Sequence, residues 1–362
     1  MDILIYILFI VALLLLIFNF LIYSALNKVF RYKEFGKSKV NISVVIAAKN
    51  EADNIVVLID SLKNQIFDKD KYEVIIVDDN SNDNTFKIAT QACSLTNNFK
   101  VIKAENKIFE GKRGALDIGI KNSQNPYILI TDADCIPNSE WINSFANGFE
   151  NDSDFLFGVA PFKSSNSIVN LIARFENLRA SIIVFAFSKL GLPYSASARS
   201  FGFSKEAFDK INGYENTTSS LSGDDDLLLQ QAIKHGLKIS KVTNQEAFVF
   251  SKTKETYLEY ANQKSRHTST SIYYSKRSQM ILLIWHILNI TSIFSVFLIP
   301  INILFVFPFF IKLVIDIFVL NNFQGNFGYK LNPILFIALQ IHYEINLIYF
   351  FFKDILIQTG GV

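Results

Sequence analysis

Two carboxylates one residue apart, Asp132 and Asp134, close a short apolar run at residues 128–135. A run of this length predicts a buried strand, and the alternation of side chains places both carboxylates on one side of its end. Ligands of open α/β sheets bind just beyond the carboxyl ends of the strands, where this pair would lie. The two charges repel each other, and a divalent cation carrying phosphate oxygens would neutralise them. Taken alone, the pair is more typical of solvated turn aspartates.

A second acidic cluster, Asp224, Asp225 and Asp226, follows Gly223 and opens a helical pattern. Carboxylates at the start of a helix complement its dipole, which is a purely structural explanation. Adjacent carboxylates also raise the pKa of at least one member of the cluster. A carboxylate with a raised pKa can accept a proton during catalysis. The cluster alone leaves both interpretations open.

The elements that would position these groups alternate between strand and helix. Apolar runs predict strands at 41–48, 72–77, 99–103 and 127–131, and helical patterns lie near 53–64, at 85–94 and from 111 onward. Such alternation predicts a doubly wound, mostly parallel sheet. Its strand ends would gather one set of polar side chains at a single crevice: Glu51, Asp78, Asp79, Lys112, Asp132 and Asp134. Further along, we expect a strand at 155–162 and, at 168–190, a helix lying on the sheet or on the membrane surface.

Composition divides the chain into a membrane part and a soluble part. Half of the 362 residues are hydrophobic and the mean hydropathy is +0.26, yet the charged residues concentrate in the middle. Residues 3–25 are almost unbroken in apolar character, too long for a cleaved signal peptide and without a positive side chain before them. We therefore expect an uncleaved anchor. A basic flank follows it, which by the positive-inside rule places the next domain in the cytoplasm: Lys28, Arg31, Lys33, Lys37 and Lys39.

The C-terminal part predicts further membrane helices. Residues 280–320 have room for two helices with a break at Pro300 or Pro308, and 333–352 for another. Lys312 and Asp316, four residues apart, are expected to form a packing pair. The predicted domains are an anchor at 1–27, a catalytic domain at 40–250, a basic juxtamembrane segment at 251–279, and two or three membrane helices at 280–357.

Charge and cysteine content exclude several classes of protein. A formal net charge of +2 gives no global basic field for nucleic acid. Cys93 and Cys135 lie far apart without metal-ligand spacing, which supports neither a disulfide framework nor a zinc site.

Six short stretches in order resemble one family: ISVVIAAKNE (42–51), IIVDDNSNDNT (75–85), GKRGAL (111–116), TDADC (131–135), GDDDL (223–227) and QKSRH (263–267). The chain from Val40 to His267 is similar to the membrane-embedded members of glycosyltransferase family 2. The resemblance implies a GT-A fold, the Rossmann-like mixed sheet of nucleotide-diphospho-sugar transferases, flanked by N-terminal and C-terminal transmembrane helices.

The resemblance also implies residue roles. Glu51, Asp78 and Asp79 would hold the base and ribose of the nucleotide, and Lys112 would lie near it. Asp134 would bind Mg2+ or Mn2+, and Asp132 the ribose or the metal. The implied catalytic base is Asp225, and Asp224 is a close second because the extra acid Asp226 makes the register ambiguous. Gln263 and Arg266 match the Q-x-x-R pair that would meet the diphosphate and the acceptor.

Two positions depart from the family pattern. His267 stands where the family's Q-x-x-R-W motif has tryptophan, and Ser200 replaces an asparagine often found before the next strand. The first departure affects the acceptor-facing part of the site.

These features together predict an inverting, metal-dependent transferase that moves sugar from a UDP- or GDP-type donor to a lipid or glycan acceptor. We expect it to contact membrane lipids and no nucleic acid, as a multi-pass protein of the bacterial inner membrane with a cytoplasmic catalytic domain. The alternatives are a processive polysaccharide synthase, a glycoside hydrolase with paired carboxylates, and a catalytically inactive membrane scaffold.

Overall fold

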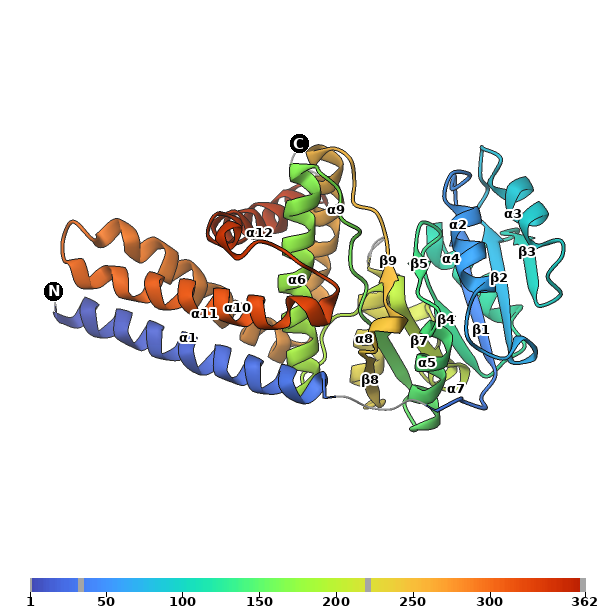
Figure 1. The fold of residues 1–362 in the computed structure, drawn as a ribbon, viewed down its shortest axis with the longest axis horizontal. Helices are drawn as coiled ribbons and strands as arrows, with labels where there is room; N and C mark the ends of the chain where they lie inside the picture. The colour runs from blue at the N-terminus through green and yellow to red at the C-terminus, as the bar shows by residue number, and fades with distance from the viewer. Residues whose placement is uncertain (1, 32–35, 219–222, 359–362) are drawn as a thin grey trace. The chain divides into compact units, whose positions relative to one another are not determined.

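The computed structural model describes residues 2–31, 36–218 and 223–358 (Figure 1). Lys33 of the predicted basic flank and Ser222, which precedes the acidic cluster, lie outside these ranges. The chain divides into two compact units. The sheet unit comprises Tyr32–Lys163 and Ser195–Thr253, and the helical unit comprises Met1–Arg31, Ser164–Tyr194 and Lys254–Val362.

A seven-stranded sheet of order β3-β2-β1-β4-β7-β6-β8 organises the sheet unit. The first four strands in this order are parallel, whereas β7 runs antiparallel to both of its neighbours. The mixed α/β sheet predicted from sequence is confirmed, and β3 begins and ends where expected. The strands are β1 (Ile42–Ala48), β2 (Tyr72–Asp78), β3 (Phe99–Lys103), β4 (Tyr127–Ile130), β6 (Phe155–Gly158), β7 (Phe201–Ser204) and β8 (Ile239–Val242).

Helices cover both faces of this sheet. The buried side chains of α2 (Ile55–Lys63), α3 (Thr85–Cys93) and α5 (Trp141–Glu150) pack on one face, and α4 (Gly111–Lys121) packs on β1 and β2 from the other. Gly119 permits the close approach of α4, because a Cβ there would lie 2.3 Å from Val45 Cγ1. A small antiparallel sheet of β5 (Ile136–Pro137) and β9 (Val249–Phe250) extends beyond β4.

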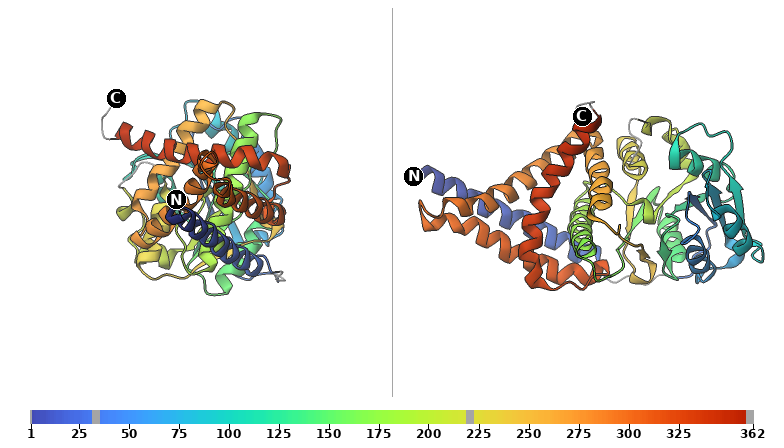
Figure 2. Two further views of the ribbon diagram at one scale, coloured as in Figure 1. Left: turned by 90° about the vertical axis from the view of Figure 1, so that its left-hand side faces the viewer. Right: turned by 90° about the horizontal axis from the view of Figure 1, so that it is seen from above.

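Among the residues that the structure describes, the helical unit contains four segments that are long and apolar enough to cross a membrane: Ile3–Val29, Lys276–Leu298, Ile303–Phe327 and Pro333–Phe350. The first lies within α1 (Asp2–Val29), the next two contain α10 (Lys276–Phe294) and α11 (Phe307–Phe323), and the last includes the start of α12 (Phe336–Gln358). α1 packs beside α10 and α11 (Figure 2). The chain turns at Pro300, whereas Pro308 lies in the first turn of α11, where its missing N–H costs nothing.

One helix differs from the predicted domain organisation. α6 (Ile168–Lys189) falls within the predicted catalytic domain at 40–250, but the structure groups it with the helical unit, where it packs against α1, α11 and α12. Arg179 on α6 is buried and pairs with Asp316 at 2.8 Å and with Glu344 at 3.1 Å. Asp316 also pairs with Lys312 at 2.5 Å, which confirms that expected packing pair. The charges on α6 led us to expect a helix on the sheet or on the membrane surface, because the partners that bury Arg179 lie far along the chain.

Candidate active site

The carboxyl ends of β1 and β2 form the edge at which the predicted site residues gather. Asp78 closes β2 and lies opposite Ala48, the last residue of β1. Asp79 follows and donates its backbone N–H to the Ala48 carbonyl at 2.7 Å. Beyond the strands, Asn50 and Asn80 both adopt a φ of 55°, a left-handed conformation that asparagine tolerates. The chain thus turns directly after each of the two strands, close to the acidic side chains at their ends.

The loops after β1 and β2 are joined to each other. Glu51 donates its backbone N–H to Thr85 Oγ1 at 2.7 Å, and its carboxylate accepts from Asn54 Nδ2 at 2.8 Å. Asp78 is buried, and its Oδ1 has no hydrogen-bond partner within the described part of the chain. A buried acceptor without a donor is costly, so Oδ1 is suited to meet a donor group of a ligand. Glu51 and Asp78 thus lie at one strand edge, as predicted.

Asp79 has a partner that the sequence motifs did not identify. Lys107, in the loop before α4, forms an ion pair with its carboxylate. No motif marks Lys107, because it lies outside the GKRGAL stretch and reaches Asp79 only through the fold.

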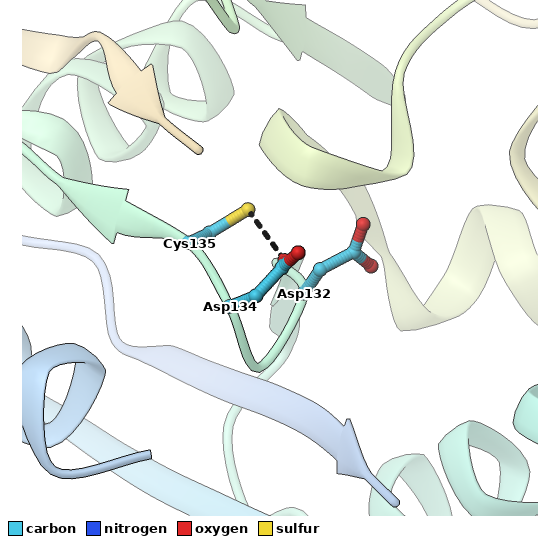
Figure 3. A group of neighbouring side chains, drawn as sticks. All are labelled: Asp132, Asp134 and Cys135. Carbon is cyan, nitrogen blue, oxygen red and sulfur yellow. Dashed lines mark hydrogen bonds between the residues drawn. The ribbon is translucent and has the colours of Figure 1, made fainter. Parts of the chain in front are cut away.

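Asp132 and Asp134 follow β4 directly, and Cys135 completes a group whose potential ligand atoms lie within 4.8 Å of one another (Figure 3). The Cys135 thiol lies 3.6 Å from Asp134 Oδ1. Burial, together with the charges of the two aspartates, raises the pKa of Cys135 well above its usual range. This shift favours the protonated thiol, whereas the thiolate is the form that binds metals. The two carboxylates supply the hard oxygen donors that Mg2+ and Mn2+ prefer.

The start of α4 links the two acidic clusters. Lys112 forms an ion pair with Asp132, and the adjacent Arg113 pairs with Asp224 at 2.5 Å. Burial alone would lower the pKa of Lys112, but the nearby carboxylates, Asp132 first among them, raise it above its usual value. The sequence predicted Lys112 at the site and missed Arg113. The position of Arg113 beside Lys112 in the first turn of the same helix was the signal that could have identified it as a site residue.

The third part of the site is the start of α8 (Asp224–Lys234). Asp225 accepts the backbone N–H of Ala198 at 2.6 Å, and Asp226 accepts that of Ala196 at 3.1 Å. Burial raises the pKa of Asp225 and outweighs the opposing effect of Lys112. The residues just before β7 therefore hold two of the three acids in place.

Ser200, the departure from the family pattern in the sheet unit, has a packing role. Its Oγ accepts the indole N–H of Trp141 at 3.1 Å, and a Cβ on Gly158 would lie 2.3 Å from it. A small hydroxyl fits this buried position.

Gln263 and Arg266 lie on α9 (Tyr257–Ser269) and are described with the helical unit. Their predicted role in meeting the diphosphate stays a prediction. Arg266 is exposed, and the helix is fixed by the Tyr260 hydroxyl, which donates to Glu176 Oε2 at 2.5 Å.

The arrangement of the sheet unit is found in other proteins. The solved mannosyltransferase PcManGT from Pyrobaculum calidifontis, in complex with GDP-Man and Mn2+, is similar in structure with a TM-score of 0.57 and 15% sequence identity, over 96% of this chain and 99% of that one. This likeness defines the class of the fold, which is GT-A.

Sequence comparison adds a family match and several relatives. Residues 43–211 match the model of Glycosyl transferase family 2. Glycosyltransferase AglE of Haloferax volcanii is 33% identical over 28% of this chain and 33% of its own length. Beta-monoglucosyldiacylglycerol synthase of Trichormus variabilis is 35% identical over 28% of this chain and 22% of its own length. Residues 43–211 are thus similar to family 2 glycosyltransferases, and the chain spans less than half the length of these curated relatives.

Proposed function

We propose that this protein is an inverting glycosyltransferase that uses a nucleotide-diphosphate sugar, with Asp225 as its catalytic base. The observation that supports this proposal most strongly is that the acids of the site differ in their bonding partners. Asp132 and Asp224 each form an ion pair with a cation of α4, whereas Asp225 accepts hydrogen bonds from backbone N–H groups. A buried carboxylate with a raised pKa and no ion-pair partner among the described residues is suited to accept a proton.

The proposed reaction is a single displacement at the anomeric carbon. Asp225 takes the proton of an acceptor hydroxyl as its oxygen bonds to that carbon, and the bond to the donor's diphosphate breaks. Attack from the side opposite the leaving group inverts the anomeric centre. Glu51, Asp78 and Asp79 are proposed to bind the nucleoside, with the buried Oδ1 of Asp78 meeting one of its donor groups.

A divalent cation is proposed at Asp132 and Asp134, where it would offset the charge of the diphosphate when bound. The carboxylate oxygens fit this role, and the remaining coordination positions would belong to phosphate oxygens and water. Lys112, paired with Asp132, offsets that carboxylate's charge in the structure described.

The acceptor is proposed to be a lipid or a lipid-linked glycan at the membrane surface. Four segments can span a membrane by length and composition, and one relative is named as a synthase of a glucosylated diacylglycerol. Lys28 lies in the last turn of the first segment and Arg31 follows it, which supports placing the sheet unit on the cytoplasmic side.

Calorimetric titration tests the donor and metal sites. We expect full-length protein in detergent to bind either UDP or GDP in the presence of Mn2+, and to lose this binding with a chelator or with Asp134→Ala. Glu105→Ala, which changes an exposed residue of the same unit outside the site, is the control. Absence of binding to both nucleotides would reject the transferase.

The nucleotide that binds then names the donor for a transfer assay with a membrane lipid extract. A product with one added sugar supports the proposal, whereas a long glycan would identify a processive synthase. The orientation in the membrane can be tested with Glu105→Cys, which should react with a membrane-impermeant maleimide in inverted vesicles and not in intact cells. The native Cys93 and Cys135 are buried, so they should add little background labelling.

A further inference from the structure

Arg199 lies at the metal motif, although no sequence motif includes it. It precedes β7, which runs antiparallel to β4 with Phe201 opposite Ile130. The Arg199 carbonyl accepts the hydroxyl of Thr131 at 2.8 Å, and Thr131 is the residue before Asp132. The chain before β7 therefore lies against the end of β4.

The side chain of Arg199 is directed to the residues that follow Asp132. Its Nη1 donates to Ser251 Oγ at 2.8 Å, and its guanidinium lies over the Phe162 ring, 4.4 Å from the centroid. In the small sheet, Ile136 of β5 pairs with Phe250 of β9. Continuing this antiparallel register by one residue brings Ser251 opposite Cys135. The guanidinium is thus bonded to a residue that this register places opposite Cys135, the neighbour of Asp134 in the chain.

The charge environment of Arg199 differs from that of the cations in and just before α4. The side-chain partners of Arg199 that the structure describes are all uncharged: Ser197, Ser251 and Phe162. By contrast, Lys107 forms an ion pair with Asp79, Lys112 with Asp132 and Arg113 with Asp224.

We propose that Arg199 is a diphosphate-binding residue of the donor site, an inference that rests on the proposed function. A guanidinium stacked on an aromatic ring and held by a hydroxyl is oriented in advance, and its planar fork matches phosphate oxygens. Since no carboxylate neutralises it among the described contacts, its charge is available to a bound anion. Negative charge grows on the diphosphate as its bond to the sugar breaks, and Arg199 would donate hydrogen bonds to it at that stage.

The test compares nucleotides that differ by one phosphate. Full-length protein in detergent is titrated with UDP, GDP, UMP and GMP in the presence of Mn2+. We expect Arg199→Met to weaken diphosphate binding about 10–100-fold, the loss typical of a charged hydrogen-bonding partner. Monophosphate binding should change less than about threefold, and Arg199→Lys should recover part of the loss.

Arg174→Met is the matched control. Arg174 is also stacked on an aromatic ring, that of Tyr329 at 5.6 Å, and also donates to a serine, Ser164 at 2.9 Å, but it belongs to the helical unit. The Arg174→Met protein should bind the diphosphates and the monophosphates like the unmodified protein. Unchanged diphosphate affinity in Arg199→Met, or an equal loss for monophosphate and diphosphate, would overturn the inference alone. Failure of the unmodified protein to bind UDP or GDP would reject the proposed function, and this inference with it.

Discussion

The guanidinium of Arg113 lies 2.5 Å from the carboxylate of Asp224, and both side chains are largely buried. This pair gives the first acid of the cluster a partner and leaves the second, Asp225, bonded to backbone N–H groups. The two positions that sequence alone leaves nearly equivalent therefore differ in charge environment. The assignment of the base to Asp225 rests on that difference.

Asp225→Asn is expected to lower kcat by about 10²–10⁴-fold, because the proton acceptor is lost. Nucleotide affinity in the presence of Mn2+ should change little, since the substitution preserves the size of the side chain. Asp224→Asn should act differently and lower the thermal stability, because it leaves the buried Arg113 without its counter-charge. Initial rates, calorimetry and thermal unfolding of both variants measure these effects. A loss of kcat confined to Asp224→Asn, with Asp225→Asn fully active, would reverse the assignment.

The pH dependence of kcat should report the raised pKa of Asp225. A base works only when unprotonated, so the rate should fall as the pH drops through a pKa above the ordinary aspartate value of about 4. The charge of Lys112 lowers that pKa, so Lys112→Met should move the acid limb of the profile to higher pH. Lys121→Met, at an exposed position on the same helix, is the control and should leave the limb in place. A shift to lower pH in Lys112→Met would contradict this account.

Arg179→Met is expected to destabilise the helical unit by about 3–5 kcal/mol, because it leaves Asp316 and Glu344 buried with less counter-charge. Thermal unfolding in detergent measures the effect. Arg174→Met, whose described partners are an aromatic ring and a serine, should cost less. Equal stability of the two variants would show that the buried network contributes little.

Gly119→Ala tests how closely α4 must approach the sheet. A Cβ at this position would lie 2.3 Å from Val45 and 3.0 Å from Val77, so we expect a loss of about 1–3 kcal/mol. Gly36→Ala, with no atom within 4 Å of its built Cβ, should be neutral. Because α4 also carries Lys112 and Arg113, nucleotide affinity should fall in Gly119→Ala. Unaltered stability would mean that α4 can shift without cost.

The sequence predicted those parts of the protein that depend on local pattern. The first four strands, the D-x-D pair and Lys112 follow from apolar runs and from residues at their ends, and the structure brings them to one edge, whereas β5, β8 and β9 were not predicted. Lys107 was missed because it lies outside every motif and its partner comes from another segment. Arg113 lies beside Lys112, which was a local signal, but its pairing with Asp224 depends on a distant segment. The grouping of α6 with the helical unit was missed for the same reason. The sequence around a single arginine on a helix does not indicate which distant carboxylates will pair with it.

The partners of Arg179 come late in the chain: Asp316 is 137 residues further on and Glu344 is 165. During translation, all of the sheet unit leaves the ribosome before either carboxylate has been made. The two buried ion pairs of Arg179 can therefore both be in place only after Glu344 in α12, the last helix described, has been synthesised.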